Sequence, residues 1–351
     1  MSVKRRISML VIAAIMLLLT SCGRNDAFNI ANNDEQESEV QGDDENAKVE
    51  QVSEMSNKVV YETIPDEYRQ EADERGEIQS IDYQTDGGEK EAYVYLPYGY
   101  DENDTDVRYD IIYMMHGGGG SAAEYLGTPS SPNYVKNAVD NLIEKSEINP
   151  VIIVAPTFYS KGDNDASVSN ASVLTEKFPT EFINDLMPKI EETYHTYAES
   201  VSLEGLKASR EHRAFGGFSM GSVTTWYMFA DALDYVSKFI PESGDCWIVE
   251  QMGGANVTEE TVEKLKEAVI NRGFDSSDFI IYAATGTEDI AYSQLNAQIE
   301  EMKTESEVFK FSVIKGEGNL YYNLAEGMTH DYGPSRDYFY DALKFLYGII
   351  I

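Results

Sequence analysis

The segment Gly216-Gly217-Phe218-Ser219-Met220-Gly221 has the residue types and spacing of a turn that presents a nucleophile. The pattern Gly-x-Ser-x-Gly is typical of a sharp turn between a strand and a helix, with the serine at its tip. Glycine is needed on both sides because a Cβ there would collide across the turn. An apolar segment, 213–218, precedes the serine, and a helical pattern, 223–233, follows it. We therefore predict that Ser219 is a catalytic nucleophile.

A serine nucleophile needs a histidine as base and an acid that orients this histidine. His330 is the only histidine that follows the nucleophile in the sequence, and it precedes the last predicted helix. Asp289 comes after the apolar segment 279–284, so we expect it at the carboxyl end of that strand, in reach of the imidazole. Glu288 is the main rival for this role, and Asp331 is expected to point away from the base.

A run of glycines, His116-Gly117-Gly118-Gly119-Gly120, ends the apolar strand predicted over 110–115. Glycine allows backbone N–H groups to approach a ligand closely. We assign an oxyanion hole to the backbone N–H groups of Gly118 and Met220, with Gly119 as the alternative to Gly118. A phosphate-binding loop is disfavoured because the run lacks the Lys-Ser/Thr ending of that motif.

Aromatic residues near the expected strand ends are candidates for substrate binding. Trp247 ends the segment 241–247, which follows the strand after the nucleophile helix. Its ring is suited to stack on a sugar or an aromatic acyl group, and packing in the core is an equally open alternative. Further candidates of the same kind are Tyr159, Tyr292 and Tyr332.

From about residue 70 onward, strand and helix patterns alternate, which predicts an α/β fold with a mostly parallel central sheet and helices on both faces. Strands are expected at 76–85, 91–97, 110–115, 151–155, 213–218, 239–241, 279–284 and 309–314, and helices at 178–194, 223–233 and 337–347. The sheet would bring the ends of its strands, and with them the candidate residues, to one edge.

The N-terminal part of the chain has the pattern of a lipoprotein signal peptide, residues 1–22. A basic start and an apolar run over 9–19 lead to Leu19-Thr20-Ser21-Cys22-Gly23, which resembles the bacterial lipobox. We predict a lipid on Cys22 that anchors the protein at the bacterial cell surface or the periplasmic face; a simple signal peptide or an uncleaved anchor are the alternatives. Residues 23–72 are expected to form an acidic, disordered tether, and residues 73–351 the catalytic domain.

The overall composition excludes several classes of partner and site. The formal net charge of −35 opposes binding to nucleic acid or to anionic lipid head groups. With two cysteines and four histidines, none in a close pair, a structural metal site or a disulfide framework is not expected. The predicted chemistry needs no cofactor, and the sequence leaves the oligomeric state open.

The chain resembles an esterase group of the α/β-hydrolases that includes the feruloyl and acetylxylan esterases of carbohydrate esterase family 1, esterase D-like enzymes and mycolyltransferases. The resemblance covers roughly residues 73–351 and is carried by segments 111–120, 217–221, 243–247, 286–289 and 327–332. It implies the α/β-hydrolase fold and, by matching position, a triad of Ser219, Asp289 and His330. The four glycines after His116 depart from relatives that often carry a bulkier residue there.

The resemblance implies a serine esterase that cleaves feruloyl or acetyl esters of plant polysaccharide through an acyl-enzyme. Two alternatives stay open. One is an esterase or acyltransferase of the same fold that acts on a siderophore or lipid ester. The other is a surface carbohydrate-binding protein without turnover.

Overall fold

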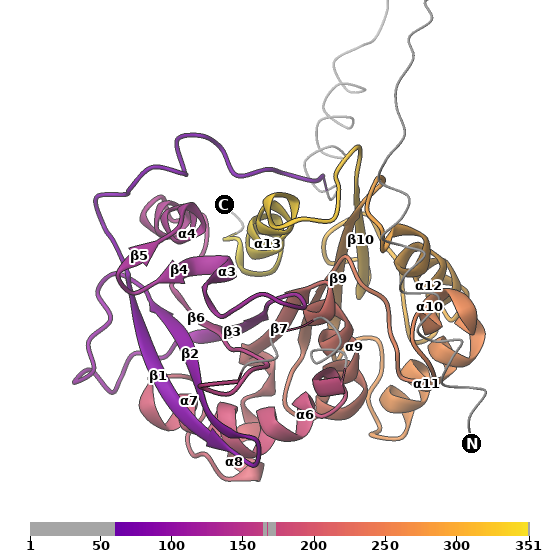
Figure 1. Ribbon diagram of the computed structural model, residues 1–351, viewed down its shortest axis with the longest axis horizontal. Helices are drawn as coiled ribbons and strands as arrows, with labels where there is room; N and C mark the ends of the chain where they lie inside the picture. Colours follow the sequence, from indigo (N-terminus) through magenta and orange to yellow (C-terminus); the bar gives the residue numbers. More distant parts are fainter. Residues whose placement is uncertain (1–59, 164–166, 168–172, 350–351) are drawn as a thin grey trace, which may run out of the picture. The chain divides into compact units, whose positions relative to one another are not determined.

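A computed structural model describes residues 60–163, 167 and 173–349 of the chain. Its centre is an eight-stranded sheet in the order β1-β2-β6-β3-β7-β8-β9-β10 (Figure 1). Every neighbouring pair from β6 to β10 is parallel, whereas β1 and β2 join the edge in antiparallel pairings. The strands are β1 (Glu77–Thr85), β2 (Gly88–Leu96), β3 (Asp110–Met115), β6 (Val151–Ala155), β7 (Arg213–Phe218), β8 (Lys238–Glu242), β9 (Ile280–Gly286) and β10 (Leu320–Ala325). The predicted mostly parallel sheet is confirmed.

Helices cover both faces of this sheet, as the sequence predicts (Figure 1). One face carries α3 (Ala123–Leu126), α4 (Tyr134–Glu144) and α13 (Tyr332–Tyr347). The other carries α6 (Phe178–Glu181), η1 (Phe182–Leu186), α7 (Met187–Thr193), α8 (Leu203–Ala208), α9 (Met220–Ala232), α11 (Thr258–Ile270) and α12 (Tyr292–Thr304). The remaining short elements are β4 (Gly127–Thr128), β5 (Ser131–Pro132), η2 (Arg210–His212) and α10 (Gly253–Asn256).

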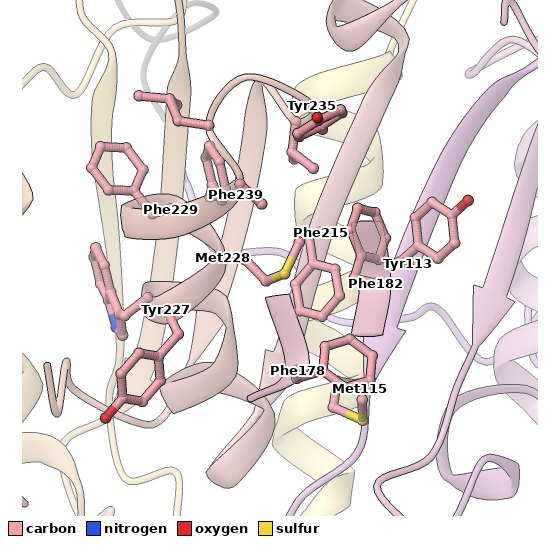
Figure 2. Close-up of a cluster of buried hydrophobic side chains, with 14 of the residues drawn as sticks. Tyr113, Met115, Phe178, Phe182, Phe215, Tyr227, Met228, Phe229, Tyr235 and Phe239 are labelled. Carbon is pink, nitrogen blue, oxygen red and sulfur yellow. The ribbon is translucent and has the colours of Figure 1, made fainter. Parts of the chain in front are cut away.

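Strand β3 shows why the central strands are continuous apolar runs. Ile111, Tyr113 and Met115 pack into the core under α6 and α9, whereas Ile112 and Met114 pack into the core under α4 and α13. Figure 2 shows Tyr113 and Met115 among the aromatic rings of the first of these cores. Because successive side chains of a strand point to opposite faces, a strand covered on both sides must be apolar at every position.

The helix predicted over 178–194 forms as a helix of three parts, α6, η1 and α7. In the middle part the N–H of Met187 donates to the carbonyl of Phe182, five residues back. Pro188 follows directly and has no N–H to offer an α-helical hydrogen bond. The π-type turn therefore adjusts the helix at the residue before this proline.

The strand predicted at 309–314 is wrong, and the edge strand is β10 instead. Phe311 makes only an isolated bridge, to Leu320. The side chain of Asn319 explains the difference, because its Oδ1 accepts the N–H of Lys310 and its Nδ2 donates to the carbonyl of Val308. Backbone groups that a strand would offer to a neighbour are thus partly bound by one asparagine.

The predicted boundary between tether and domain at residues 72 and 73 is also wrong. Ile64 is buried, and its N–H donates to Asp337 of α13 at 3.0 Å. The N–H of Glu62 donates to Asp341 of the same helix. The segment from about residue 61 therefore belongs to the folded domain, because it is bound by α13.

The predicted signal peptide, Cys22 and the greater part of the predicted tether lie outside the described residues. Among the residues that the structure describes, no helix combines the length and the apolar character needed to cross a membrane.

Candidate active site

Ser219 lies at the tip of the turn between β7 and α9, as the sequence predicts. Its backbone has φ 57° and ψ −114°, a conformation that a residue with a side chain rarely adopts. A hydrogen bond of 2.9 Å from its N–H to the carbonyl of Glu242 joins the turn to the end of β8. A Cβ built on Gly217 or Gly221 would lie 2.3 or 2.2 Å from the carbonyl oxygen of Met115. Both glycines are therefore required by the close approach of β3, not only by the turn itself.

The structure brings Ser219, His330 and Asp289 together in one hydrogen-bonded chain. His330 Nε2 lies 2.9 Å from Ser219 Oγ, and His330 Nδ1 lies 2.8 Å from Asp289 Oδ1. Since a carboxylate only accepts hydrogen bonds, Nδ1 carries the proton and Nε2 is left free to accept the proton of the serine. The side chain of Asp289 is fully buried and that of His330 is 18% exposed. This arrangement is able to activate a serine hydroxyl as a nucleophile.

The rivals of Asp289 are directed elsewhere. Glu288 is exposed, and Asp331 caps α13 by accepting the N–H of Gly333 at 2.8 Å. Asp289 Oδ1 also accepts the N–H of Ala291 at 2.7 Å, which fixes the carboxylate at the end of β9. The turn after β9 thus selects one acid among the three candidates.

The loop that carries His330 is bound directly to the loop that carries Asp289. The N–H of Gly327 donates to Thr287 Oγ1 at 2.8 Å, and the N–H of Glu288 donates to the carbonyl of Met328. A Cβ on Gly286 would lie 1.9 Å from that same carbonyl oxygen. The base and its acid therefore come from two backbone segments in close contact.

The glycine loop after β3 is held from several sides. The N–H of Gly117 donates to Tyr332 Oη at 2.8 Å, and the N–H of Gly119 donates to Tyr159 Oη at 3.0 Å. The N–H of Gly120 donates to the carbonyl of Gly117. In the part of the chain that the structure describes, the N–H of Gly118 has no partner. Of the two donors left open by the sequence, Gly119 is thus already bound, and Gly118 is free to bind an oxyanion.

His116 lies beneath this loop and supports it. It is buried, and burial lowers the pKa of its imidazole to about 4, so the ring is neutral at neutral pH. Its Nδ1 lies 2.7 Å from the carbonyl of Gly117, which requires the proton on Nδ1, and its Nε2 accepts from Thr157 Oγ1 at 2.9 Å. His116 is therefore a structural residue and not a second base.

Met220, the other predicted donor, is the first residue of α9. A backbone N–H in the first turn of a helix has no partner within the helix, and the dipole of the helix favours negative charge there. Within the described residues, the N–H of Met220 makes no hydrogen bond. The N–H groups of Gly118 and Met220 are thus both available as donors on segments that border Ser219.

Trp247 and Tyr292 are both partly exposed and lie in segments next to the triad. Trp247 follows Gly244, where a Cβ would lie 2.7 Å from the carbonyl oxygen of Ser219. The indole N–H of Trp247 donates to Asp245 Oδ1 at 3.0 Å, and part of its ring packs against the core. Tyr292 begins α12, and its N–H donates to the carbonyl of Asp289.

Sequence reasoning missed the part that two tyrosines play. Tyr159 and Tyr332 are candidates for stacking on substrate, but the structure directs their hydroxyl groups to the glycine loop. The only sequence signal was the position of Tyr332 two residues after the base.

Within the described ranges, no group of three or more His, Cys, Asp or Glu side chains is placed to hold a metal ion.

Comparisons with known proteins identify an esterase family. The model of a family described as "Putative esterase" matches residues 84–345. Endo-1,4-beta-xylanase Y of Acetivibrio thermocellus is 37% identical over 289 residues, which are 82% of this chain and 25% of that protein. The chain thus spans a quarter of the length of this relative.

Solved structures show the same similarity. The feruloyl esterase module from Clostridium thermocellum, a serine-to-alanine mutant in complex with sinapinate, is 36% identical, with a TM-score of 0.70, and the match covers 82% of this chain and 94% of that one. A ferulic acid esterase from the anaerobic fungus Anaeromyces mucronatus is 19% identical with a TM-score of 0.58, over 82% of this chain and 97% of that one, and shows the shared fold alone.

Proposed function

The chain belongs to this esterase family and is a carboxylic ester hydrolase, and from that premise we propose that it releases feruloyl groups from plant polysaccharide, with Ser219 as nucleophile. The observation that carries the catalytic part is the hydrogen-bonded chain from Ser219 Oγ through His330 to Asp289.

In the proposed first step His330 Nε2 takes the proton of Ser219 Oγ as this oxygen attacks the ester carbonyl. The N–H groups of Gly118 and Met220 donate to the oxyanion of the tetrahedral intermediate. One such donor contributes about 3 kcal/mol to the stability of the transition state. Asp289 stabilises the imidazolium that forms.

When the intermediate collapses, the C–O bond to the sugar breaks and the alcohol leaves with the proton from His330. The acyl group stays on Ser219 as an ester. His330 then takes a proton from water as the water oxygen attacks the acyl carbonyl. When this second intermediate collapses, the C–O bond to Ser219 breaks, Ser219 Oγ takes the proton from His330, and a free carboxylic acid is released.

The choice of feruloyl over acetyl esters is supported by two observations. The feruloyl esterase module at 36% identity is a complex with sinapinate, a phenolic acid. Trp247 and Tyr292, which are partly exposed and lie on segments that adjoin the triad, offer flat rings of the kind that suit a phenolic acyl group or a sugar face. We propose both as substrate-binding residues.

The proposal is tested by incubating the purified protein with arabinoxylan and measuring released ferulate and acetate, next to a long-chain aryl ester. We expect ferulate release, and none from the Ser219→Ala variant. Hydrolysis of the long-chain ester with the highest kcat/KM, with neither polysaccharide ester cleaved, would contradict the proposed substrate. Absence of labelling by a fluorophosphonate would instead favour a carbohydrate-binding protein without turnover.

We also propose that Cys22 carries a lipid that anchors the protein to a bacterial membrane. The support is the lipobox-like segment ending at Cys22 after an apolar run over 9–19. The Cys22→Ser variant is then expected in the soluble or culture fraction, as measured by immunoblotting of fractionated cells. Retention of this variant in the membrane fraction would point to an uncleaved helix as the anchor.

A further inference from the structure

The glycine loop contains one free N–H group between two that are bound by tyrosine hydroxyls. Tyr332 Oη accepts the N–H of Gly117, and Tyr159 Oη accepts the N–H of Gly119. These are alternate positions of the loop, and Gly118 lies between them. The two hydroxyls therefore fix the peptide groups on both sides of the expected oxyanion donor.

The two tyrosines come from different parts of the fold. Tyr159 follows β6 and packs against His116, with ring centroids 5.6 Å apart. Tyr332 begins α13, two residues after His330, and its ring lies 5.0 Å from that of Phe218, which in turn lies 4.6 Å from the ring of His330. The segment that carries the base, His330, thus also contacts the glycine loop.

The glycine at the end of the run is explained by the same contact. A Cβ built on Gly120 would lie 2.5 Å from Tyr332 Oη, whereas the next nearest atoms are at 3.2 Å. The backbone of Gly120 does not have a positive φ, so the side chain of Tyr332, rather than the conformation of the loop, is what excludes a Cβ there. Tyr332 and the fourth glycine of the loop are therefore matched in shape.

We propose that Tyr332 and Tyr159 are positioning residues for the oxyanion hole, which hold the glycine loop so that, among the N–H groups of this loop, that of Gly118 faces the reacting carbonyl. This inference rests on the proposed esterase function. It also means that Tyr332 couples two parts of the machinery, since a shift of the His330 loop would shift the hole as well. Burial raises the pKa of the Tyr332 phenol, so the hydroxyl stays neutral through the working range of an esterase.

The direct test is the Tyr332→Phe variant, which keeps the ring and removes the hydroxyl. We expect kcat for a feruloyl aryl ester to fall roughly tenfold to a hundredfold with KM nearly unchanged, because an oxyanion donor acts in the transition state. Affinity for an arylboronic acid, which forms a tetrahedral adduct with a reactive serine, should fall in parallel. Affinity for ferulate should not change. Tyr159→Phe is expected to act in the same direction.

The matched control is Tyr347→Phe. Tyr347 lies at the end of the same helix, is buried, and its hydroxyl has no partner among the described residues. This variant removes a buried tyrosine hydroxyl from α13 without touching the glycine loop, so kcat and boronate affinity should match those of the wild type. A thermal melt of each variant shows whether the fold is retained.

A double-mutant cycle tests the matched shapes of Gly120 and Tyr332. Gly120→Ala alone should lower kcat, because the new Cβ displaces the Tyr332 hydroxyl. In the Tyr332→Phe background the same change should cost much less, since the closest contact is gone. Additive effects would contradict the proposed contact.

Wild-type kcat and boronate affinity in a folded Tyr332→Phe variant would overturn the inference and leave the proposed function intact. An equal loss in Tyr347→Phe would also overturn it, because the effect would then be general to α13. A wild-type protein without any ester hydrolysis would instead refute the proposed function itself.

Discussion

The nucleophile turn and the glycine loop lie side by side but are held in place in different ways. The turn at Ser219 is constrained mainly by neighbouring backbone, through the carbonyls of Met115 and Glu242. The glycine loop is held by side chains, among them Tyr159 and Tyr332, which are distant in sequence. The position of the nucleophile is therefore determined by the packing of neighbouring strands, and that of the oxyanion hole by long-range contacts.

The largest effect is expected from Ser219→Ala, which removes the nucleophile from the backbone-held turn. We expect a loss in kcat of about 10⁶-fold with the fold intact, as found when a catalytic serine is removed elsewhere. Circular dichroism and steady-state hydrolysis of a feruloyl aryl ester check both points. More than a trace of activity in the purified variant would rule out Ser219 as nucleophile.

Asp289→Asn should reduce kcat by about 10⁴-fold while KM changes little. An amide can donate to His330 Nδ1, which would stabilise the tautomer that has its proton on Nε2 and cannot accept from Ser219 Oγ. Glu288→Gln is the control, because this side chain is exposed and the hydrogen bonds of the base go to Asp289 and Ser219 instead. Similar losses in both variants would mean that the acid has been assigned wrongly.

An alanine substitution in the nucleophile turn and one in the glycine loop should affect stability differently. At Gly221 a Cβ would meet a backbone oxygen at 2.2 Å, and at Gly120 it would meet the end of a side chain at 2.5 Å. Gly221→Ala is therefore expected to reduce the free energy of unfolding by about 3 kcal/mol, and Gly120→Ala by much less. Urea denaturation measures both. Equal destabilisation would remove the proposed distinction between the two regions.

The smallest effect concerns Glu242, whose carbonyl supports the Ser219 turn. Its buried side chain accepts hydrogen bonds from Tyr125 and from Ser335 in the first turn of α13. Burial raises the pKa of this carboxyl from 4.5 to about 8, so the folded protein favours the protonated form. The unfolded chain releases this proton at lower pH, so the free energy of unfolding should fall as pH rises from about 4.5 to about 8.

Denaturation at several pH values checks this expectation for Glu242. The Glu242→Gln variant, which cannot ionise, should show a flatter pH dependence across that window than the wild type. If the free energy of unfolding of the wild type and of the variant depended on pH in the same way across that window, a buried, protonated Glu242 would be contradicted.

Much of the fold and the site could be predicted because it is encoded in short segments. Ser219, Asp289 and His330 each follow or precede a clear element, so the topology brings them to one edge of the sheet. The choice between Gly118 and Gly119 stayed open because it depends on the hydroxyl of Tyr159, forty residues away. The wrong strand at 309–314 has a similar cause, since a single side chain, that of Asn319, binds its backbone.

In the proposed mechanism, Ser219 carries the acyl group during turnover. The most direct measurement is rapid quenching of the enzyme with a feruloyl ester of a good leaving group, followed by mass spectrometry of its peptides. We expect a feruloyl adduct on the peptide that contains Ser219, formed with the burst of leaving group and lost on further incubation. An adduct on another residue, or full turnover by the Ser219→Ala variant, would contradict it.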